Sequence, residues 1–271
     1  EIDLFLENSN FGTNRSDEEI SGLSVGMSYN VTDRFSIYSE FTQLFGRTQN
    51  PYEESDEGYN TFDDKLGSGF IPFGFKADWD RVSFSFDYRQ NTEKFLFHYW
   101  DQNYDDNRVV IYQNEDGGVT ATTKEDLLYK YGKSNGIQFS ITSYMKYFGL
   151  SFTYSHMNSD IWDRKAIENE NETFSGDYTS DDNNTLYAKF DLDTSMIDRL
   201  RIAEIFYQQS HIDEPFHFEP NENSLFGYNL GIDMSENMTL LVKGRKSYVP
   251  NGYDADGDFI YDSIRTTQIE T

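Results

Sequence analysis

The sequence predicts an all-β protein, an antiparallel up-and-down β-barrel of twelve strands. Three observations lead to this prediction. Apolar and polar residues alternate with a period of two along many segments, short and long connections alternate along the chain, and aromatic residues make up 17% of the 271 residues. Alternation with a period of two is typical of strands whose two faces meet different environments.

The clearest strand pair is Ser68 to Arg89, with the sequence SGFIPFGFKADWDRVSFSFDYR. One face carries aromatic and aliphatic side chains, and the other carries small, polar or charged ones. The apolar face is formed by Ile71, Phe73, Phe75, Ala77 and Trp79 in the first strand and by Val82, Phe84, Phe86 and Tyr88 in the second. The short stretch Asp78 to Arg81 closes the two strands into a hairpin.

Ten further segments continue this pattern before and after the hairpin. In chain order the predicted strands are Glu1 to Asn10, Ile20 to Val31, Phe35 to Gly46, Ser68 to Trp79, Val82 to Arg89, Ile137 to Tyr147, Leu150 to His156, Leu186 to Leu192, Leu200 to Gln209, Phe226 to Met234, Leu240 to Gly244 and Phe259 to Thr271. Leu200 to Gln209 is mixed on both faces, so its facing stays open. A further strand pair within Lys94 to Tyr112 would raise the number to fourteen.

The predicted connections are of two kinds. Five are short and lie around Asp33, Asp80, Phe148, Ser195 and Asn237, and Asp-Arg recurs at three of them. The others are longer and mostly acidic or polar, at 11–19, 47–65, 90–135, 158–183, 210–223 and 247–258. Residues 90–135 are interpreted as one long, partly structured loop with a short helical turn within Lys124 to Tyr131. Because the two kinds alternate strictly, all long loops lie at one end of a single domain spanning residues 1–271.

Composition narrows the class of protein further. The net charge is −26, which argues against a nucleic-acid partner. There are no cysteines, so a disulfide framework, a thiolate metal site and a cysteine nucleophile are excluded. No run of about 18 apolar residues predicts a transmembrane helix, but the strands of a transmembrane barrel need only about 10 alternating residues. No signal peptide is visible, so we expect an exported protein to be seen here in its mature form.

Taken together, these patterns resemble bacterial outer-membrane β-barrels, and most of all the small monomeric porins of the OmpG and KdgM type. The resemblance covers nearly the whole chain and lies in its alternation, its aromatic strand ends and its tight turns opposite long acidic loops. It implies short periplasmic turns, long extracellular loops at the cell surface, and contact with outer-membrane lipid and lipopolysaccharide. Such barrels usually end in an aromatic residue, whereas this chain ends Gln268-Ile269-Glu270-Thr271.

The charged residues on the polar strand faces are the candidate pore lining. They are Lys76, Arg89, Lys146, Lys189, Lys243, Arg245, Asp87 and Asp191, with Glu40, Asp78 and Asp233 beside them. In a water-filled pore these groups would set a transverse field and select among solutes. Alternatively, they pair across the interior and fill it, because small barrels can be filled by side chains.

One acidic loop has the spacing of a cation site. Asp254, Asp256 and Asp258 alternate around Gly257, and Asp262 follows four residues later. Carboxylates spaced in this way can converge on one Ca²⁺ ion in an extracellular loop. The glycine position and the missing glutamate at position 12 depart from the EF-hand pattern, and a solvated acidic hairpin loop is the alternative.

Enzyme chemistry is not predicted. None of the four histidines is followed two residues later by a serine, the arrangement of outer-membrane phospholipase, and no glycine-rich phosphate loop opens a helix. We therefore expect a channel for passive diffusion of small hydrophilic solutes, oligosaccharides among them. A closed barrel that displays its loops as an adhesin, receptor or protein-docking surface is the alternative. A soluble β-sandwich that binds carbohydrate is the third interpretation.

Overall fold

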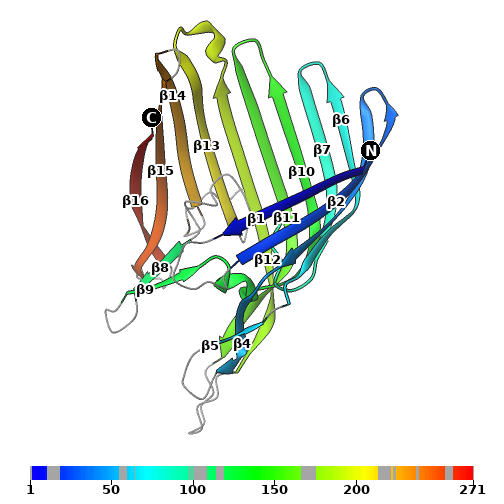
Figure 1. The fold of residues 1–271 in the computed structure, drawn as a ribbon, viewed down its shortest axis with the longest axis vertical. Helices are drawn as coiled ribbons and strands as arrows, with labels where there is room; N and C mark the ends of the chain where they lie inside the picture. The colour runs from blue at the N-terminus through cyan, green and yellow to red at the C-terminus, as the bar shows by residue number, and fades with distance from the viewer. Residues whose placement is uncertain are drawn as a thin grey trace.

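A computed structural model describes residues 2–10, 19–54, 60–63, 65–97, 99, 109–113, 119–165, 175–212, 221, 224–235, 238–253 and 259–270. The described part of the chain is all-β apart from two short 3-10 helices (Figure 1). Its strands form one sheet of twelve antiparallel strands and two small sheets of two strands each.

The twelve strands of the main sheet are neighbours in the order in which they occur along the chain. They are β1 (Ile2–Asn10), β2 (Glu19–Thr32), β3 (Phe35–Phe45), β6 (Ser68–Trp79), β7 (Val82–Asn91), β10 (Tyr131–Tyr144), β11 (Phe148–Lys165), β12 (Ser175–Leu192), β13 (Leu200–Ile212), β14 (Ser224–Ser235), β15 (Met238–Tyr253) and β16 (Phe259–Glu270). The prediction of an up-and-down arrangement of twelve strands is confirmed.

The elements outside the main sheet lie in two of the long connections and in one turn. These are β4 (Thr48–Glu54) and β5 (Asn60–Asp63), β8 (Val109–Gln113) and β9 (Val119–Thr123), and the helices η1 (Asp126–Lys130) and η2 (Thr194–Met196), of which η2 belongs to a turn. Because β8 and β9 pair with each other in a sheet of their own, the alternative of fourteen strands is wrong. The predicted helical turn within Lys124 to Tyr131 is confirmed by η1.

The main sheet curls strongly. Figure 1 shows β1 and β2 passing across the view in front of β11 and β12, with β15 and β16 at the other edge of the sheet. Among the residues that the structure describes, β1 is paired with β2 and β16 with β15, and no backbone pairing joins β1 to β16. The closed cylinder therefore stays a prediction.

The three tight turns that contain Asp-Arg share one backbone contact. The carbonyl oxygen of Arg34 accepts a hydrogen bond from the backbone N–H of Asp78 at 2.8 Å. Those of Arg81 and Arg199 accept from Tyr144 and Asp233, each at 2.7 Å. Each turn thus uses its arginine carbonyl to hold the next strand of the sheet, so backbone pairing continues to the end of the strand.

The turn before β13 is longer and is built on η2. The carboxylate of Asp193 accepts a hydrogen bond from the backbone N–H of Ser195 at 3.0 Å. Hydrogen bonds from the Ser195 side chain and backbone hold the pKa of the Asp193 carboxyl below its ordinary value. Arg199, just before β13, has a positive φ of 64°, which closes the turn.

The hairpin of β6 and β7 contains an irregularity that the alternation did not predict. Its register shifts between Phe70 and Phe73, so Ile71 and Pro72 together lie opposite a single residue of β7. Proline has no backbone N–H to donate to a neighbouring strand, which is why it lies at such a bulge. The extra residue reverses the facing before it, so Phe70 is exposed while Ile71 is buried. The prediction that Ile71 shares a face with Phe73 is wrong.

Three strands are much longer than the sequence indicated: β11, β12 and also β15, which continues to Tyr253 although residues 247–258 were expected to be a loop. Residues 158–183 were expected to be a loop, but β11 continues to Lys165, β12 begins at Ser175, and the two are paired residue by residue over this length. The outer halves of these strands are mostly polar, and their few apolar residues, such as the neighbours Ile161 and Trp162, fall on both faces, so they lack the alternation by which strands were recognised. In the opposite direction, β10 ends at Tyr144, earlier than expected, and residues 145–147 form the turn.

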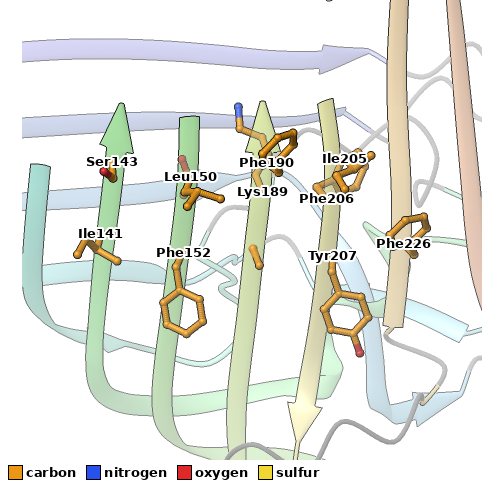
Figure 2. Close-up of a pocket in the computed structure, with 12 residues that line it drawn as sticks. Ile141, Ser143, Leu150, Phe152, Lys189, Phe190, Ile205, Phe206, Tyr207 and Phe226 are labelled. Carbon is orange, nitrogen blue, oxygen red and sulfur yellow. The ribbon is translucent and has the colours of Figure 1, made fainter. Parts of the chain in front are cut away.

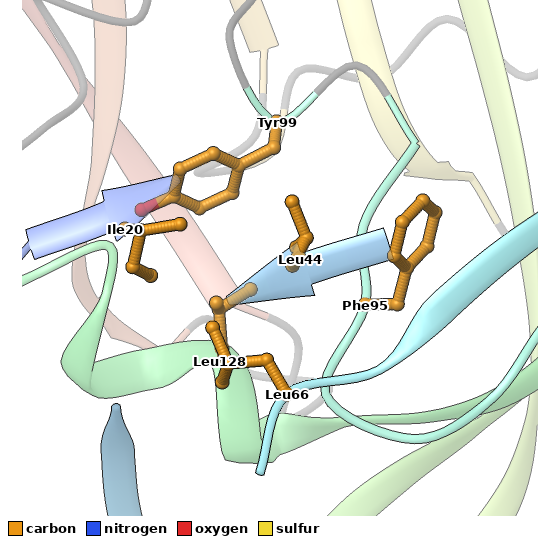
Figure 3. Close-up of a cluster of buried hydrophobic side chains, with 6 residues drawn as sticks. All are labelled: Ile20, Leu44, Leu66, Phe95, Tyr99 and Leu128. Carbon is orange, nitrogen blue, oxygen red and sulfur yellow. The ribbon is translucent and has the colours of Figure 1, made fainter. Parts of the chain in front are cut away.

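A buried apolar cluster lies where the long connection between β7 and β10 meets the sheet. It consists of Ile20, Leu44, Leu66, Phe95, Tyr99 and Leu128, with Leu96, Phe97 and Tyr131 packed against it (Figure 3). The residues Phe95 to Phe97, Tyr99 and η1 are called the inward segment below. Gly69 makes room for it, because a Cβ atom there would lie 2.4 Å from the Phe95 ring.

Candidate functional site

Strand pairing shows which side chains share a face of the main sheet. One row of directly paired residues runs across nine neighbouring strands, from β6 to β16: Asp78, Ser83, Thr142, Ser151, Lys189, Phe206, Gly227, Arg245 and Thr266. We call this face, on which the inward segment packs, the inner face. The row resolves the ambiguous facing of β13, because Glu204, Phe206 and Gln208 all lie on the inner face.

Seven of the eight candidate pore residues lie on strands and share this inner face. They are Lys76, Arg89, Lys189, Lys243, Arg245, Asp87 and Asp191. Lys146 does not join them, because it lies in the turn after β10, where its ammonium group is 4.9 Å from the centre of the Tyr147 ring. Alternation placed Lys146 on the inner face because the strand was taken to run to Tyr147.

Asp87 and Arg89 form a buried ion pair on β7. The Arg89 Nε donates to Asp87 Oδ1 at 2.5 Å, and the two side chains are only 8% and 3% exposed, respectively. The Tyr38 hydroxyl donates to Asp87 Oδ2 at 2.9 Å, and the Arg89 guanidinium lies 5.1 Å from the centre of the Phe97 ring. Gly74 leaves space for the Tyr38 ring, which would otherwise meet a Cβ atom at 2.4 Å. This group therefore ties the inner face to the inward segment.

A second charged network spans β12 to β15. The Lys189 ammonium lies 2.6 Å from Asp191 Oδ1 and 3.6 Å from Glu204 Oε2. Asn229 donates to Glu204 at 2.5 Å and accepts from the Arg245 guanidinium at 2.9 Å. The sequence did not single out Glu204 or Asn229, because neither the facing of β13 nor its register against β14 is visible in the alternation.

Phe206 is an apolar residue within this network. Its side chain is 3% exposed, its ring covers Gly227, and the Arg245 guanidinium lies 4.9 Å from the ring centre. A cation held over an aromatic face is stabilised by the ring quadrupole. The inner face therefore fixes Arg245 in position through both Phe206 and Asn229.

The remaining candidate charges are paired near the edges of this face. Lys76 lies 3.1 Å from Asp78, with both side chains about half exposed, and Lys243 lies 2.9 Å from Glu270 of β16. The candidate pore charges on the strands thus pair with neighbours on the same or the adjacent strand. Such pairing leaves the inner face polar, with most of these cations held against carboxylates.

The inward segment is held by buried hydrogen bonds as well as by its apolar cluster. Thr48 is fully buried, and its hydroxyl donates to the Glu125 carbonyl at 2.8 Å and accepts from the Tyr129 N–H at 3.2 Å. The Tyr178 hydroxyl donates to the Tyr129 carbonyl at 2.6 Å. Burial lowers the pKa of the Lys130 ammonium at the end of η1. The sequence signal for this segment was its run of aromatic and apolar residues within an otherwise polar loop.

Between the inward segment and the inner face lies a cavity of about 200 Å³. Its sheet side is lined by residues of β7 and β10 to β13, and the inward segment lines the rest, together with Lys124 and Tyr131. We call this space the inner cavity. Its sheet side is rich in uncharged hydroxyl and amide groups: Gln138, Ser155, Ser159, Asn183, Thr185, Gln208 and Ser210.

The other face of the sheet, the outer face, is apolar and exposed. Its exposed large side chains include Met27, Tyr29, Phe41, Phe73, Trp79, Ile137, Ile141, Leu150, Ile205, Phe226 and Tyr228. Figure 2 shows an apolar groove on this face, with Ile141, Leu150, Phe152, Phe190, Ile205 and Phe226 around it. The volume of the groove is about 480 Å³. Its floor is a row of paired residues on neighbouring strands, in which the small side chain of Ala188 lies between Phe152 and Tyr207.

Aromatic side chains gather on the outer face near the tight turns. Tyr29 and Trp79 lie within the last few residues of β2 and β6, and each exposes more than half of its surface. Amphipathic rings at this level are typical of the girdle at a membrane interface.

The proposed calcium ligands are only partly within the described residues. Asp254, Asp256 and Asp258 lie outside them, and Asp262 lies exposed on β16 opposite Val249. Within the part of the chain that the structure describes, no three His, Asp or Glu side chains are grouped as metal ligands. The calcium site thus stays a prediction.

Comparisons with known proteins add little to this description. No protein-family model matches the sequence, and no curated protein matches it. The fold is similar to the ferric enterobactin receptor PfeA in complex with BCV-L6, with a TM-score of 0.42, and to a mutant of that receptor from Pseudomonas aeruginosa in complex with enterobactin, with a TM-score of 0.41. Each is 12% identical over 86% of this chain, which spans 34% of the receptor's length. Among the described residues, no helix is long and apolar enough to cross a membrane.

Proposed function

We propose that this protein is a bacterial outer-membrane β-barrel channel through which small hydrophilic solutes diffuse. The observation that carries the proposal is the opposite chemistry of the two sheet faces. Large apolar side chains are exposed on the outer face, while hydrogen-bonded charges cover the inner face. An apolar surface of this extent is stable when it meets lipid rather than water.

The tight turns and the long connections support the same orientation. In outer-membrane barrels the turns are periplasmic and the long loops extracellular. The exposed aromatic residues Tyr29 and Trp79 lie on the outer face at the turn end and would mark the periplasmic interface. The extended polar ends of β11 and β12 would then project beyond the hydrocarbon layer on the extracellular side.

Closure of the sheet is part of the proposal. In hydrocarbon every backbone N–H and C=O group must be paired, so only a closed sheet can span the membrane. With twelve up-and-down strands, β1 and β16 run antiparallel to each other and can pair. The chain has no cysteine, so cysteine pairs placed in β1 and β16 would form disulfides in the folded protein if the two strands are adjacent.

Conductance is the direct test of the channel. We expect the purified protein to require detergent for solubility and to give discrete current steps in planar lipid bilayers. Heat-denatured protein at the same concentration is the control. Folded protein that remains soluble without detergent, or that inserts into bilayers and carries no current, would refute the channel.

One observation favours a second function, a plugged barrel that displays its long loops to a protein partner. The buried cluster around Leu128 and the inward segment already occupy part of the inner face at the long-loop end. A barrel plugged in this way would insert and fold but conduct only after the inward segment is loosened. Comparing the conductance of the wild type with that of a Leu128→Ala variant distinguishes the two functions.

A further inference from the structure

The inner cavity has a lining that points to one class of solute. On its sheet side, four neighbouring strands contribute amide and hydroxyl groups, including Gln138 of β10, Ser155 of β11, Thr185 of β12 and Gln208 of β13. Each such group can both donate and accept hydrogen bonds. A wall of this kind suits a solute that carries many hydroxyl groups.

The lining of the cavity carries charges of both signs. Its two basic side chains are Arg89, which is bound to Asp87 at 2.5 Å, and Lys124, whose ammonium donates to the Tyr99 carbonyl at 2.6 Å. Two carboxylates, those of Asp160 and Asp181, also line the cavity. A charged solute of either sign would therefore lose water and meet a like charge, which disfavours it relative to a neutral one.

The rest of the lining is aromatic and aliphatic. Phe95, Leu96 and Phe97 of the inward segment and Tyr131 contribute apolar surface to the cavity. The Phe95 and Phe97 rings meet edge to face, with centroids 5.0 Å apart, and Phe97 also contacts Arg89. A sugar ring has C–H groups on its faces and hydroxyl groups around its edge, so it matches an apolar surface opposed by amides and hydroxyls.

We propose that the inner cavity binds one ring of a neutral sugar, held between Gln138 and its neighbours on the sheet and the aromatic rings of the inward segment. The inference rests on the proposed function, since the cavity would be a selective station within the channel. It goes further by naming an uncharged polyhydroxylated solute and the residues that recognise it. Acidic and basic sugars of the same size would be excluded by Asp160, Asp181, Arg89 and Lys124.

Calorimetric titration of the folded, detergent-solubilised protein tests the site without requiring conductance. D-glucose and maltotriose are the neutral probes, and D-glucuronate and D-glucosamine are the charged controls. We expect the neutral probes to bind at least fivefold more tightly than the charged ones. Replacing Gln138 by leucine should weaken the neutral probes about fivefold, the amount expected for one or two lost hydrogen bonds.

Gln268→Leu is the matched control, because Gln268 lies on the inner face opposite Lys243 but outside the cavity. It should bind the neutral probes as the wild type does. A second variant, Phe97→Ala, should weaken the same probes by removing the ring surface, and its folding is checked separately by its heat-dependent shift in gel mobility.

The outcomes separate this inference from the channel itself. Neutral-sugar binding that falls in Gln138→Leu and not in Gln268→Leu supports the site, even in a protein that carries no current. Equal affinity in the wild type and Gln138→Leu, tighter binding of glucuronate, or no binding by a conducting protein would overturn the site and leave the channel standing.

Discussion

Breaking the buried ion pair on β7 should destabilise the protein strongly. An Asp87→Ala substitution removes the carboxylate that binds the Arg89 guanidinium at 2.5 Å and accepts the Tyr38 hydroxyl at 2.9 Å. Both charged side chains are almost fully buried. Removing one partner of such a pair costs about 3–5 kcal/mol, because the remaining charge stays buried.

Two further variants isolate the cause. Replacing both partners, in Asp87→Leu with Arg89→Met, should restore most of the lost stability, since apolar residues of similar volume often substitute for a buried pair at little cost. Asp78→Ala is the matched control, because its partner Lys76 and Asp78 itself are about half exposed. An exposed pair contributes about 0–1 kcal/mol.

Urea unfolding in lipid vesicles, followed by the heat-dependent shift in gel mobility, measures these differences. We expect Asp87→Ala to lose several kcal/mol, the double variant to recover, and Asp78→Ala to resemble the wild type. An Asp87→Ala variant as stable as Asp78→Ala would show that the pair is hydrated, and the description of the inner face as tightly paired around Asp87 would be wrong.

Three further substitutions test other parts of the structure. Gly227→Val places side-chain atoms against the Phe206 ring, where even a Cβ atom would lie at 2.3 Å. It should lower the free energy of unfolding in urea by about 1–3 kcal/mol. Gly26→Val is the control and should lower it much less, because a Cβ atom there would have its nearest neighbour at 3.9 Å. Lys189→Met leaves two inner-face carboxylates without their cation. The zero-current potential measured across a salt gradient should therefore indicate a higher preference for cations than in the wild type. An unchanged potential would contradict a conducting inner face. Leu128→Ala should cost about 2–5 kcal/mol locally and increase proteolysis of the inward segment.

Alternation predicted the strands of the main sheet because most of them separate an apolar face from a polar one. It failed where that contrast is missing or interrupted. The ends of β11 and β12 are mostly polar, with the apolar neighbours Ile161 and Trp162 on opposite faces, and they were taken as a loop. Pro72 interrupts the backbone pairing of β6, and one extra residue there reversed the facing of Ile71. These two errors have the same origin, since sequence shows side-chain polarity and not which backbone groups are paired.

The candidate site was predicted as a face but not as a network. Alternation correctly grouped Asp87 with Arg89 and Lys189 with Asp191 on one side of their strands. The contacts of Lys189 with Glu204, and of Arg245 with Phe206, depend on the register between neighbouring strands. Register is determined by pairing across the whole sheet, so a single strand's sequence does not contain it.

The apolar cluster was missed for a different reason. Its members come from β2, β3, the residues just before β6 and the long connection after β7. None of these residues repeats at a period that indicates a strand or a helix facing a core. The signal was compositional, in that Phe95, Leu96, Phe97 and Tyr99 are too apolar for a solvated loop.

The most direct test of the two-faced sheet is the accessibility of spin labels attached one at a time along β7 in lipid vesicles. The chain lacks cysteine, so each label occupies a single position. Labels at Phe84 and Phe86 should collide with oxygen dissolved in the lipid, and labels at Ser83 and Ser85 with a water-soluble nickel chelate. Labels at Phe84 and Phe86 that are shielded from both reagents would show that the outer face packs against protein, which would contradict the assignment to a membrane.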